Sequence, residues 1–169
     1  AGWEHVLLLM ADGGVRGFGA DAVRPLGGAP SPPAASAAAR WAAGPPLLAS
    51  LPPVRVLAAG AQHSLFVATE GTVYACGLDD AGQLGPAAAA AAATGPYDPK
   101  GRPCAALAAG WLDGERVTAL AAGRYHSLAL LSDGAVCAWG SNARGQLGTG
   151  LALGGTTQSS AAGATGRGR

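Results

Sequence analysis

Three stretches of this chain repeat one glycine-punctuated pattern around a histidine, and this periodicity constrains the fold more than any other feature. His5, His63 and His126 lie 58 and 63 residues apart, and 26 positions around them align without a gap. The glycines that recur in register are Gly2, Gly60 and Gly123; Gly13, Gly71 and Gly134; Gly19, Gly77 and Gly140; and Gly27, Gly85 and Gly148. A fixed repeat of this size is typical of solenoids and propellers, so we treat the chain as a repeat protein.

Each repeat carries the signature of an antiparallel hairpin. In the second repeat, residues 64–68 and 73–76 are apolar runs joined by Thr69-Glu70-Gly71-Thr72, and the third repeat has the same arrangement. An acid followed by glycine between two apolar runs predicts a two-residue turn, because such turns need positive φ. Residues 56–59 and 120–122 predict a strand before each histidine, and residues 46–51 and 103–107 predict short outer strands.

The predicted strands are apolar on both faces instead of alternating. This pattern is typical of a sheet that is covered by protein on each side, as the blades of a propeller are. A small residue stands at the centre of each return strand (Gly17, Ala75 and Ala138), which permits close approach of the next sheet. One blade cannot bury both faces, so the architecture requires neighbouring blades.

Three motifs carry a family resemblance: Gly-x-x-His-Ser-Leu at 60–65 and 123–128, Asp-Gly-x-Val-x-x-Trp-Gly at 133–140, and Gly-Gln-Leu-Gly at 82–85 and 145–148. Together they resemble the repeat of the regulator of chromosome condensation (RCC1) family. Cys76 replaces the tryptophan in the second repeat, and Val6 and Phe18 replace serine and tryptophan in the first. The resemblance implies an all-β fold: a segment of a seven-bladed β-propeller, with about three blades of four-stranded antiparallel sheets.

The repeat phasing divides the chain into six segments. We expect a degenerate first repeat at 1–28, an Ala/Pro-rich insertion with an outer strand at 29–53, a second repeat at 54–85, an Ala-rich insertion with an outer strand at 86–116, a third repeat at 117–150 and a flexible tail at 151–169. Residues 87–93 fit either two helical turns or a surface loop. We expect the chain to be part of a longer propeller; a free-standing unit of three blades is the alternative.

Charge and cysteine usage narrow the classes of function. The net charge is +1 with one lysine, Lys100, which argues against binding nucleic acid through its phosphates. No apolar run reaches the ~18 residues of a membrane-spanning helix, so membrane insertion is not expected. Cys76, Cys104 and Cys137 show no metal-ligand spacing and no even pairing, which favours a reducing, intracellular compartment without a disulfide framework, metal or cofactor.

The recurring residues are interpreted as structural. His63 and Ser64 cannot form a base–nucleophile pair, because adjacent residues of a strand point to opposite faces. Asp12, Glu70 and Asp133 are turn residues of their hairpins. The residues assigned to the repeat framework are Gly2, His5, Gly60, His63, Gly71, Gly77, Gly123, His126, Gly134, Trp139, Gly140 and Gly148.

The two residues before each histidine differ between repeats while their framework stays fixed, and they are the first candidates for partner binding. They are Trp3 and Glu4, Ala61 and Gln62, and Arg124 and Tyr125. In the related ultraviolet-photoreceptor branch this place carries Trp-Arg pairs at an interface; the match here is limited to Trp3 and Arg124, in separate repeats, which argues against a photoreceptor. The long loop with Trp111, Asp113 and Arg116 is the second candidate, and ordinary exposed loops are the alternative to both.

Two functions from different classes follow. The first is a non-enzymatic protein–protein interaction scaffold, a structural subunit or domain of a larger assembly whose partners are other proteins or the remaining propeller blades. The second, implied by the resemblance, is a guanine-nucleotide exchange factor for a Ran-like small GTPase. A hydrolase or metal enzyme needs converging titratable groups, which three scattered histidines do not supply.

Overall fold

The structure is a computed structural model that describes residues 1–3, 5–19, 51–85, 105–106, 112, 116–148 and 159–161. All ten elements among these residues are β-strands. They are β1 (His5–Leu9), β2 (Val15–Gly19), β3 (Val54–Ala59), β4 (His63–Ala68), β5 (Val73–Gly77), β6 (Ala105–Ala106), β7 (Val117–Ala122), β8 (His126–Leu131), β9 (Val136–Gly140) and β10 (Ser159–Ala161). The all-β expectation is confirmed.

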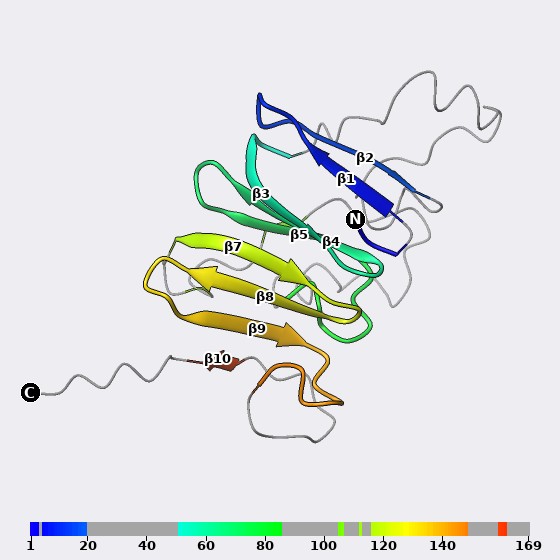
Figure 1. Cartoon of the computed structure of the whole chain (residues 1–169), viewed down its shortest axis with the longest axis vertical. Coiled ribbons are helices and arrows are strands. Elements are labelled where there is room, and N and C mark those ends of the chain that lie inside the picture. The colour runs from blue at the N-terminus through cyan, green and yellow to red at the C-terminus, as the bar shows by residue number, and fades with distance from the viewer. Residues whose placement is uncertain are drawn as a thin grey trace, which may run out of the picture.

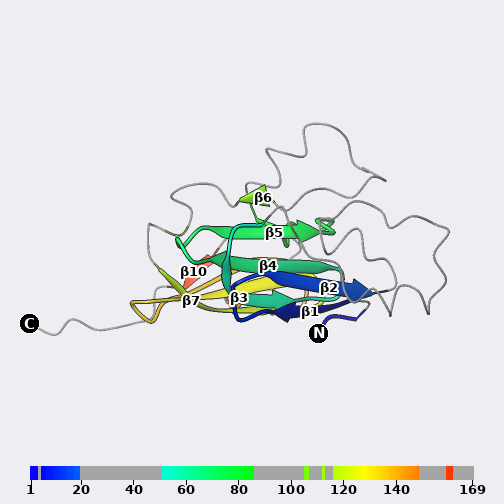
Figure 2. The same ribbon diagram turned by 90° about the horizontal axis from the view of Figure 1, so that it is seen from above.

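The strands form three antiparallel sheets that follow one another along the chain (Figure 1). The second has the order β3-β4-β5-β6 and the third the order β10-β9-β8-β7, so both have four strands, as expected. The first consists of β1 and β2, which correspond to β4 and β5 of the second sheet. Viewed from above, β3, β4, β5 and β6 succeed one another across the second sheet (Figure 2).

The register places each repeat's histidine opposite the glycine that ends the return strand. His63 pairs with Gly77, and His126 pairs with Gly140. The strands β3 and β7 each contain a register shift, at Arg55 and Thr118, and both begin earlier than the predicted strands at 56–59 and 120–122. The two complete repeats therefore fold alike, including their irregularity.

The hairpin turns are one residue longer than predicted. In the second repeat the Gly71 N–H donates to Ala68 O and the Ala68 N–H donates to Thr72 O, which makes a three-residue loop with a glycine bulge. In these hairpin loops the left-handed backbone falls on the glycine, Gly13, Gly71 or Gly134, at φ between 83° and 104°. The acid occupies the preceding position: in the first and third turns its carboxylate accepts a backbone N–H two residues on.

Outer strands are present in two sheets. Ala105 and Ala106 form β6 on β5, inside the predicted 103–107. Strand β10 pairs with β9, Ser159 opposite Ala138, so the expectation of a flexible tail is wrong for residues 159–161. The predicted outer strand at 46–51, except Leu51, and the alternatives for 87–93 lie outside the described residues.

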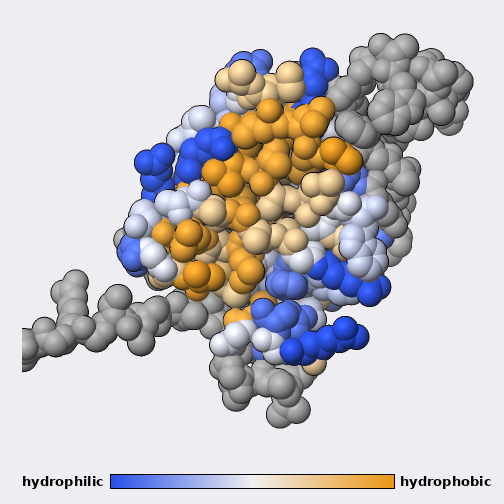
Figure 3. Space-filling model, in the orientation of Figure 1, coloured by the Kyte–Doolittle hydropathy of each residue, from blue (hydrophilic) through white to orange (hydrophobic). Residues whose placement is uncertain are grey.

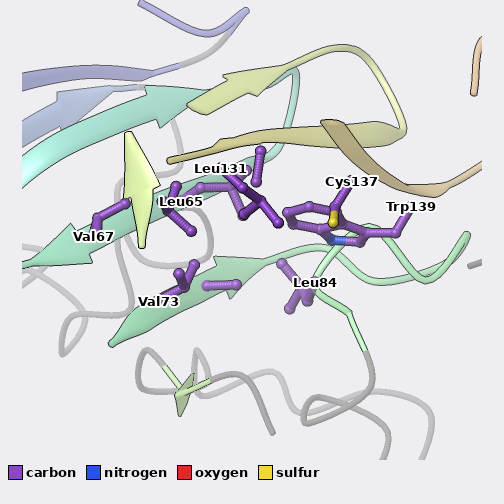
Figure 4. Packing of buried hydrophobic residues seen from close by; sticks show 10 residues of the cluster. Leu65, Val67, Val73, Leu84, Leu131, Cys137 and Trp139 are labelled. Atoms are coloured by element: carbon purple, nitrogen blue, oxygen red, sulfur yellow. The ribbon is translucent and has the colours of Figure 1, made fainter. Parts of the chain in front are cut away.

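Two apolar clusters fill the spaces between successive sheets. The larger lies between the second and third sheets and includes Trp139, which is 1% exposed and lies near Cys137 and Leu84 (Figure 4). Its other buried members are Leu65, Val67, Val73, Ala75, Leu84, Val117, Ala129, Leu131 and Cys137. The smaller lies between the first and second sheets, with Leu7, Val15, Val54, Phe66 and Cys76. The sheets therefore stack face to face, each covering its neighbour.

Apolar side chains remain exposed on the first and third sheets. Leu8, Leu9 and Met10 of the first sheet, and Leu130 and Val136 of the third, are each about 40% exposed. Figure 3 shows apolar side chains gathered over β1 and β3. Within the part of the chain that the structure describes, no helix is long and apolar enough to cross a bilayer.

Candidate functional site

One end of the sheet stack is built from the Gly-x-x-His loops and the loops that follow the return strands. The Leu78 N–H donates to Gln62 O, and the Ser141 N–H donates to Tyr125 O, at 2.8 Å each. Consecutive Gly-x-x-His loops also touch, because the Ala61 N–H donates to Gly123 O at 3.2 Å. We call this end, residues 1–3, 60–62, 78–85, 123–125 and 141–148, the loop rim.

The glycine of each Gly-x-x-His loop is required because the histidine ring folds back over it. A Cβ added to Gly60 would lie 2.2 Å from His63 Cε1 and 2.6 Å from Gly123 O. The same overlap occurs at Gly2 with His5 and at Gly123 with His126. The glycine thus fixes the direction in which each imidazole points.

Two of the three imidazoles, those of His5 and His63, reach the serine of the next sheet. His5 Nε2 lies 2.9 Å from Ser64 Oγ, and His63 Nε2 lies 3.0 Å from Ser127 Oγ. We expected His63 and its neighbour Ser64 to point to opposite faces of the strand. We did not predict these contacts, which join residues 59 and 64 positions apart. The signal was present: a His-Ser pair in successive repeats places a donor and an acceptor on opposite faces of each sheet.

The second contact continues into a buried network. Ser127 Oγ–H donates to Gln83 O at 2.8 Å, and Trp139 Nε1–H donates to the same carbonyl at 2.9 Å. Since the serine hydrogen is used, His63 must donate from Nε2, which leaves Nδ1 as the unprotonated nitrogen. We call His63, Ser127, Gln83 and Trp139 the carbonyl junction.

Burial holds the junction histidine in its neutral form. His63 and Ser127 are both fully buried. Burial first, and then the neighbouring His5 and His126, lower the pKa of His63 to about 4. His126, which is only partly buried, has its pKa lowered by burial as well. The geometry gives His63 a hydrogen-bonding role between blades, since Ser127 directs its proton to a backbone carbonyl and not to solvent.

The remaining framework glycines lie where the chain turns. Gly77 and Gly140 end the return strands at φ 114° and 97°, and Gly148 closes the Gly-Gln-Leu-Gly loop at φ 68°. In that loop the Leu147 N–H donates to Asn142 Oδ1, and the second repeat repeats the bond from Leu84 to Asp79. In the second repeat this loop positions the Gln83 carbonyl within the carbonyl junction.

The predicted partner-binding residues include three that the structure brings together. The Arg124 guanidinium lies over the Trp3 ring at 4.7 Å from its centroid and over the Tyr125 ring at 5.0 Å. Trp3 is 69% exposed, and Arg124 is exposed too. The sequence placed Trp3 and Arg124 in separate repeats; the structure stacks them across the intervening sheet. We call Trp3, Arg124 and Tyr125 the stacked cluster.

The stack is possible because the sheet between them carries a small residue. Trp3, Ala61 and Arg124 each follow the glycine of their own Gly-x-x-His loop. Ala61 is 4% exposed and presents only a methyl group at this position. The first and third sheets therefore meet over the second at the loop rim.

Of the other candidates, the structure describes Gln62 and Arg116, and neither has a ring contact with this cluster. Gln62 lies half-buried in its loop, and Glu4, Trp111 and Asp113 lie outside the described residues. Arg116 is exposed at the start of β7, while Arg124 follows the end of that strand. Six strand residues span about 20 Å, so Arg116 belongs to the opposite end of the stack.

The stacked, covered sheets define the chain as a segment of a β-propeller, and each sheet is a blade. The family model described as "Regulator of chromosome condensation (RCC1) repeat" matches residues 54–83 and 117–146, and a second model with that description matches residues 133–161. The second and third repeats of this chain therefore match RCC1 repeats.

Curated relatives share the repeats but are much longer. The chain is 38% identical over 99 residues to human Protein RCC2 and 40% identical over 90 residues to the Protein RCC2 homolog of Danio rerio. These matches cover 57% and 53% of this chain but 17% and 16% of the relatives. Human HERC6, named a probable E3 ubiquitin-protein ligase, is 35% identical over 97 residues, 57% of this chain and 8% of that protein.

Solved structures share the fold. Prp20p from Saccharomyces cerevisiae superposes with a TM-score of 0.68 at 23% identity, covering 96% of this chain and 38% of Prp20p. Yeast RCC1 (Prp20) bound to Kap60 gives a TM-score of 0.60 at 25% identity, covering 84% and 31%. Human WBSCR16 gives 0.63 at 21% identity, covering 92% and 37%. The chain corresponds to under two fifths of each of these structures.

Proposed function

We propose that this protein is a non-enzymatic interaction scaffold that binds another protein through the stacked cluster at its loop rim. The observation that carries the proposal is this cluster: the Arg124 guanidinium contacts the ring of Trp3 from blade 1 and the ring of Tyr125 from its own blade 3. Tryptophan, tyrosine and arginine are the residues that most often anchor protein interfaces. The buried framework beneath them, from glycine to imidazole to serine, holds the blades that present them.

The setting of the protein follows from the same proposal. We infer an intracellular, reducing compartment, which is supported by the buried thiols of Cys76 and Cys137. The scaffold acts as a subunit or domain of a larger assembly, since repeats of this kind present surfaces and keep their polar groups engaged within the fold. Neither membrane insertion nor direct nucleic-acid binding is part of this proposal.

Guanine-nucleotide exchange on a Ran-like small GTPase is the alternative, and the likeness to Prp20p favours it. Prp20p is described as having binding properties to Gsp1p and histones. A nucleotide-release assay separates the two functions. The scaffold proposal expects the release rate of a fluorescent guanine nucleotide from Ran-like GTPases to be unchanged by this protein, and catalytic stimulation of release would favour exchange activity instead.

Site-specific photocrosslinking tests the scaffold proposal in cells. The photoreactive residue p-benzoylphenylalanine replaces Trp3 in one variant and Met10 in a matched control. Met10 is 41% exposed and lies at the other end of β1, beside the hairpin turn. We expect a defined adduct from position 3 whose partner is identified by mass spectrometry and whose yield falls with Arg124→Gln. Equal yields from both positions, or none from position 3, would contradict the proposal.

A further inference from the structure

We infer that the stacked cluster recognises an acidic peptide segment, with a carboxylate pairing along the edge of the Arg124 guanidinium. This inference rests on the proposed function and specifies the chemistry of the partner at the same site. The Arg124 guanidinium has two ring contacts, and its N–H groups have no protein acceptor among the described residues.

Two aromatic rings, Trp3 and Tyr125, lie against the Arg124 guanidinium. A guanidinium is planar, and its five N–H groups point outward in that plane. Contact with aromatic rings is compatible with hydrogen bonding by these N–H groups to other partners. Within the described part of the chain, Arg124 has these two ring contacts, and its N–H groups donate to no protein acceptor. A forked row of donors is therefore presented at the surface.

This edge matches a carboxylate. Two parallel N–H groups of arginine bind both oxygens of a carboxylate, and such charge-assisted pairs are about twice as strong as neutral hydrogen bonds. The two rings also hold the side chain in place, so less conformational freedom is lost on binding. Trp3, at 69% exposure, offers an apolar surface beside the ion pair for the backbone or stem of the bound residue.

The neighbouring charges set the length and position of the segment. Arg144 is exposed on the loop that the Ser141 N–H joins to Tyr125, so blade 3 carries two arginines on the loop rim. Asp80 is exposed on the corresponding loop of blade 2 and carries the opposite charge. An acidic segment is attracted over blade 3 and repelled over blade 2. The site therefore fits a short acidic stretch and not a long polyanion that runs along the rim.

Fluorescence anisotropy with labelled peptides tests this chemistry. The probes are three eight-residue peptides in which glycine alternates with Glu, Gln or Lys, added to the purified protein at low salt. We expect the Glu peptide to bind at least tenfold more tightly than the Gln peptide, and the Lys peptide not to bind. Inorganic phosphate is added as a competitor, because a phosphate oxyanion can form the same pair with the guanidinium. Displacement of the Glu peptide by millimolar phosphate would assign the N–H groups of Arg124 to phosphate and overturn the carboxylate assignment.

Variants of the protein connect the binding to the cluster. Arg124→Gln should weaken binding of the Glu peptide by tenfold or more. Arg124→Lys should keep only part of the binding, because an ammonium group lacks the planar pair of N–H donors that a guanidinium offers. Arg144→Gln is the matched control, an exposed arginine without ring contacts, and should weaken binding by no more than threefold. Asp80→Asn should strengthen binding severalfold. An equal loss from Arg124→Gln and Arg144→Gln would reduce the effect to net charge and overturn the inference.

The outcomes keep this inference apart from the proposed function. A crosslinked partner at position 3 together with equal binding of the Glu and Gln peptides leaves the scaffold and removes its acidic specificity. No Glu-peptide binding also overturns the acidic inference. Absence of any crosslink at position 3 removes the scaffold proposal, whatever the peptides do.

Discussion

The two junctions between blades repeat one design with different completeness. Among the described residues, the junction of blades 1 and 2 has the His5–Ser64 contact and five buried apolar residues. The junction of blades 2 and 3 has the equivalent His63–Ser127 contact, ten buried apolar residues and the shared Gln83 carbonyl. The histidine contact is thus common to both, and among the described residues the carbonyl with two side-chain donors occurs only at the second.

One described difference between the junctions is a single residue of the repeat. Trp139 lies in the return strand of blade 3 and packs in the second junction, while its counterpart in blade 2 is Cys76 at the first junction. A cysteine fills less volume and offers no indole N–H to a carbonyl of the preceding blade. The histidine contact is thus the element that both junctions share, and Trp139 adds packing and a hydrogen bond at the second.

Removing Trp139 should produce the largest loss. Trp139→Ala leaves a cavity and deletes a hydrogen bond, so the free energy of unfolding should fall by about 3–5 kcal/mol. Cys76→Ala at the first junction should cost about 1 kcal/mol, because little volume is removed. Urea titrations followed by circular dichroism measure both values; equal losses would break the comparison between the junctions.

Acid should weaken the second junction next. The folded-state pKa of His63 is about 4, below the unfolded value of 6.5, so the unfolded chain binds more protons between these values. Stability therefore declines as pH falls from about 6.5 to 4, by about 3 kcal/mol from this group. Urea titrations at pH 7, 5.5 and 4 measure the decline, and His63→Gln should flatten it. An unchanged pH dependence in that variant would assign the acid sensitivity to other groups.

Loss of the junction serine should have an intermediate effect. Ser127→Ala removes a group that accepts from His63 and donates to Gln83 O. It should cost about 2 kcal/mol, because the buried Nε2–H of His63 loses its acceptor and Gln83 O keeps only the bond from Trp139. Ser64→Ala removes the contact to His5 and should cost about 1 kcal/mol. Thermal unfolding of the two variants side by side gives the order, and a larger loss for Ser64→Ala would reverse the proposed ranking.

The smallest effect isolates one hydrogen bond. Trp139→Phe keeps an aromatic ring but removes the indole N–H that donates to Gln83 O, so we expect a loss of about 1 kcal/mol beyond the change in volume. A second variant, Trp139→Phe with Ser127→Ala, should lose more than the sum of the single losses, because only the double variant removes both side-chain donors from the Gln83 carbonyl. Strict additivity in urea titrations would show that the two donors act independently.

The sequence predicted the blades because their information is local. Glycine spacing, apolar runs and the acid–glycine turns phase the inner strands of each blade directly, and the resemblance to the repeat family implied four strands per sheet. The turn length was wrong because the same acid–glycine pair serves two-residue and three-residue loops, and the register that separates them is set across the strands. Strand β10 was missed because Ser159-Ser160-Ala161 has no apolar signal; it pairs through its backbone.

The contacts of the candidate site depend on how blades are arranged relative to one another. Trp3 and Arg124 are 121 positions apart, and neither residue predicts the other without the angle between blades. The contact between Trp3 and Arg124 also depends on the small size of Ala61 in the loop between them. The role of Ala61 could not be predicted without the arrangement of the three loops. The repeated His-Ser pair carried enough information to predict the inter-blade bond, had opposite faces of successive sheets been considered together.

A double-mutant cycle between His63 and Ser127 tests the central claim, that each imidazole bonds the serine of the next blade. Urea titrations of His63→Ala, Ser127→Ala and the double variant give the coupling free energy, and the adjacent pair His63 and Ser64 serves as the control cycle. We predict a coupling of at least about 1 kcal/mol for His63 with Ser127 and less than about 0.5 kcal/mol for His63 with Ser64. Additive losses in the first cycle, or a coupling confined to the second, would contradict the stacking of blades described here.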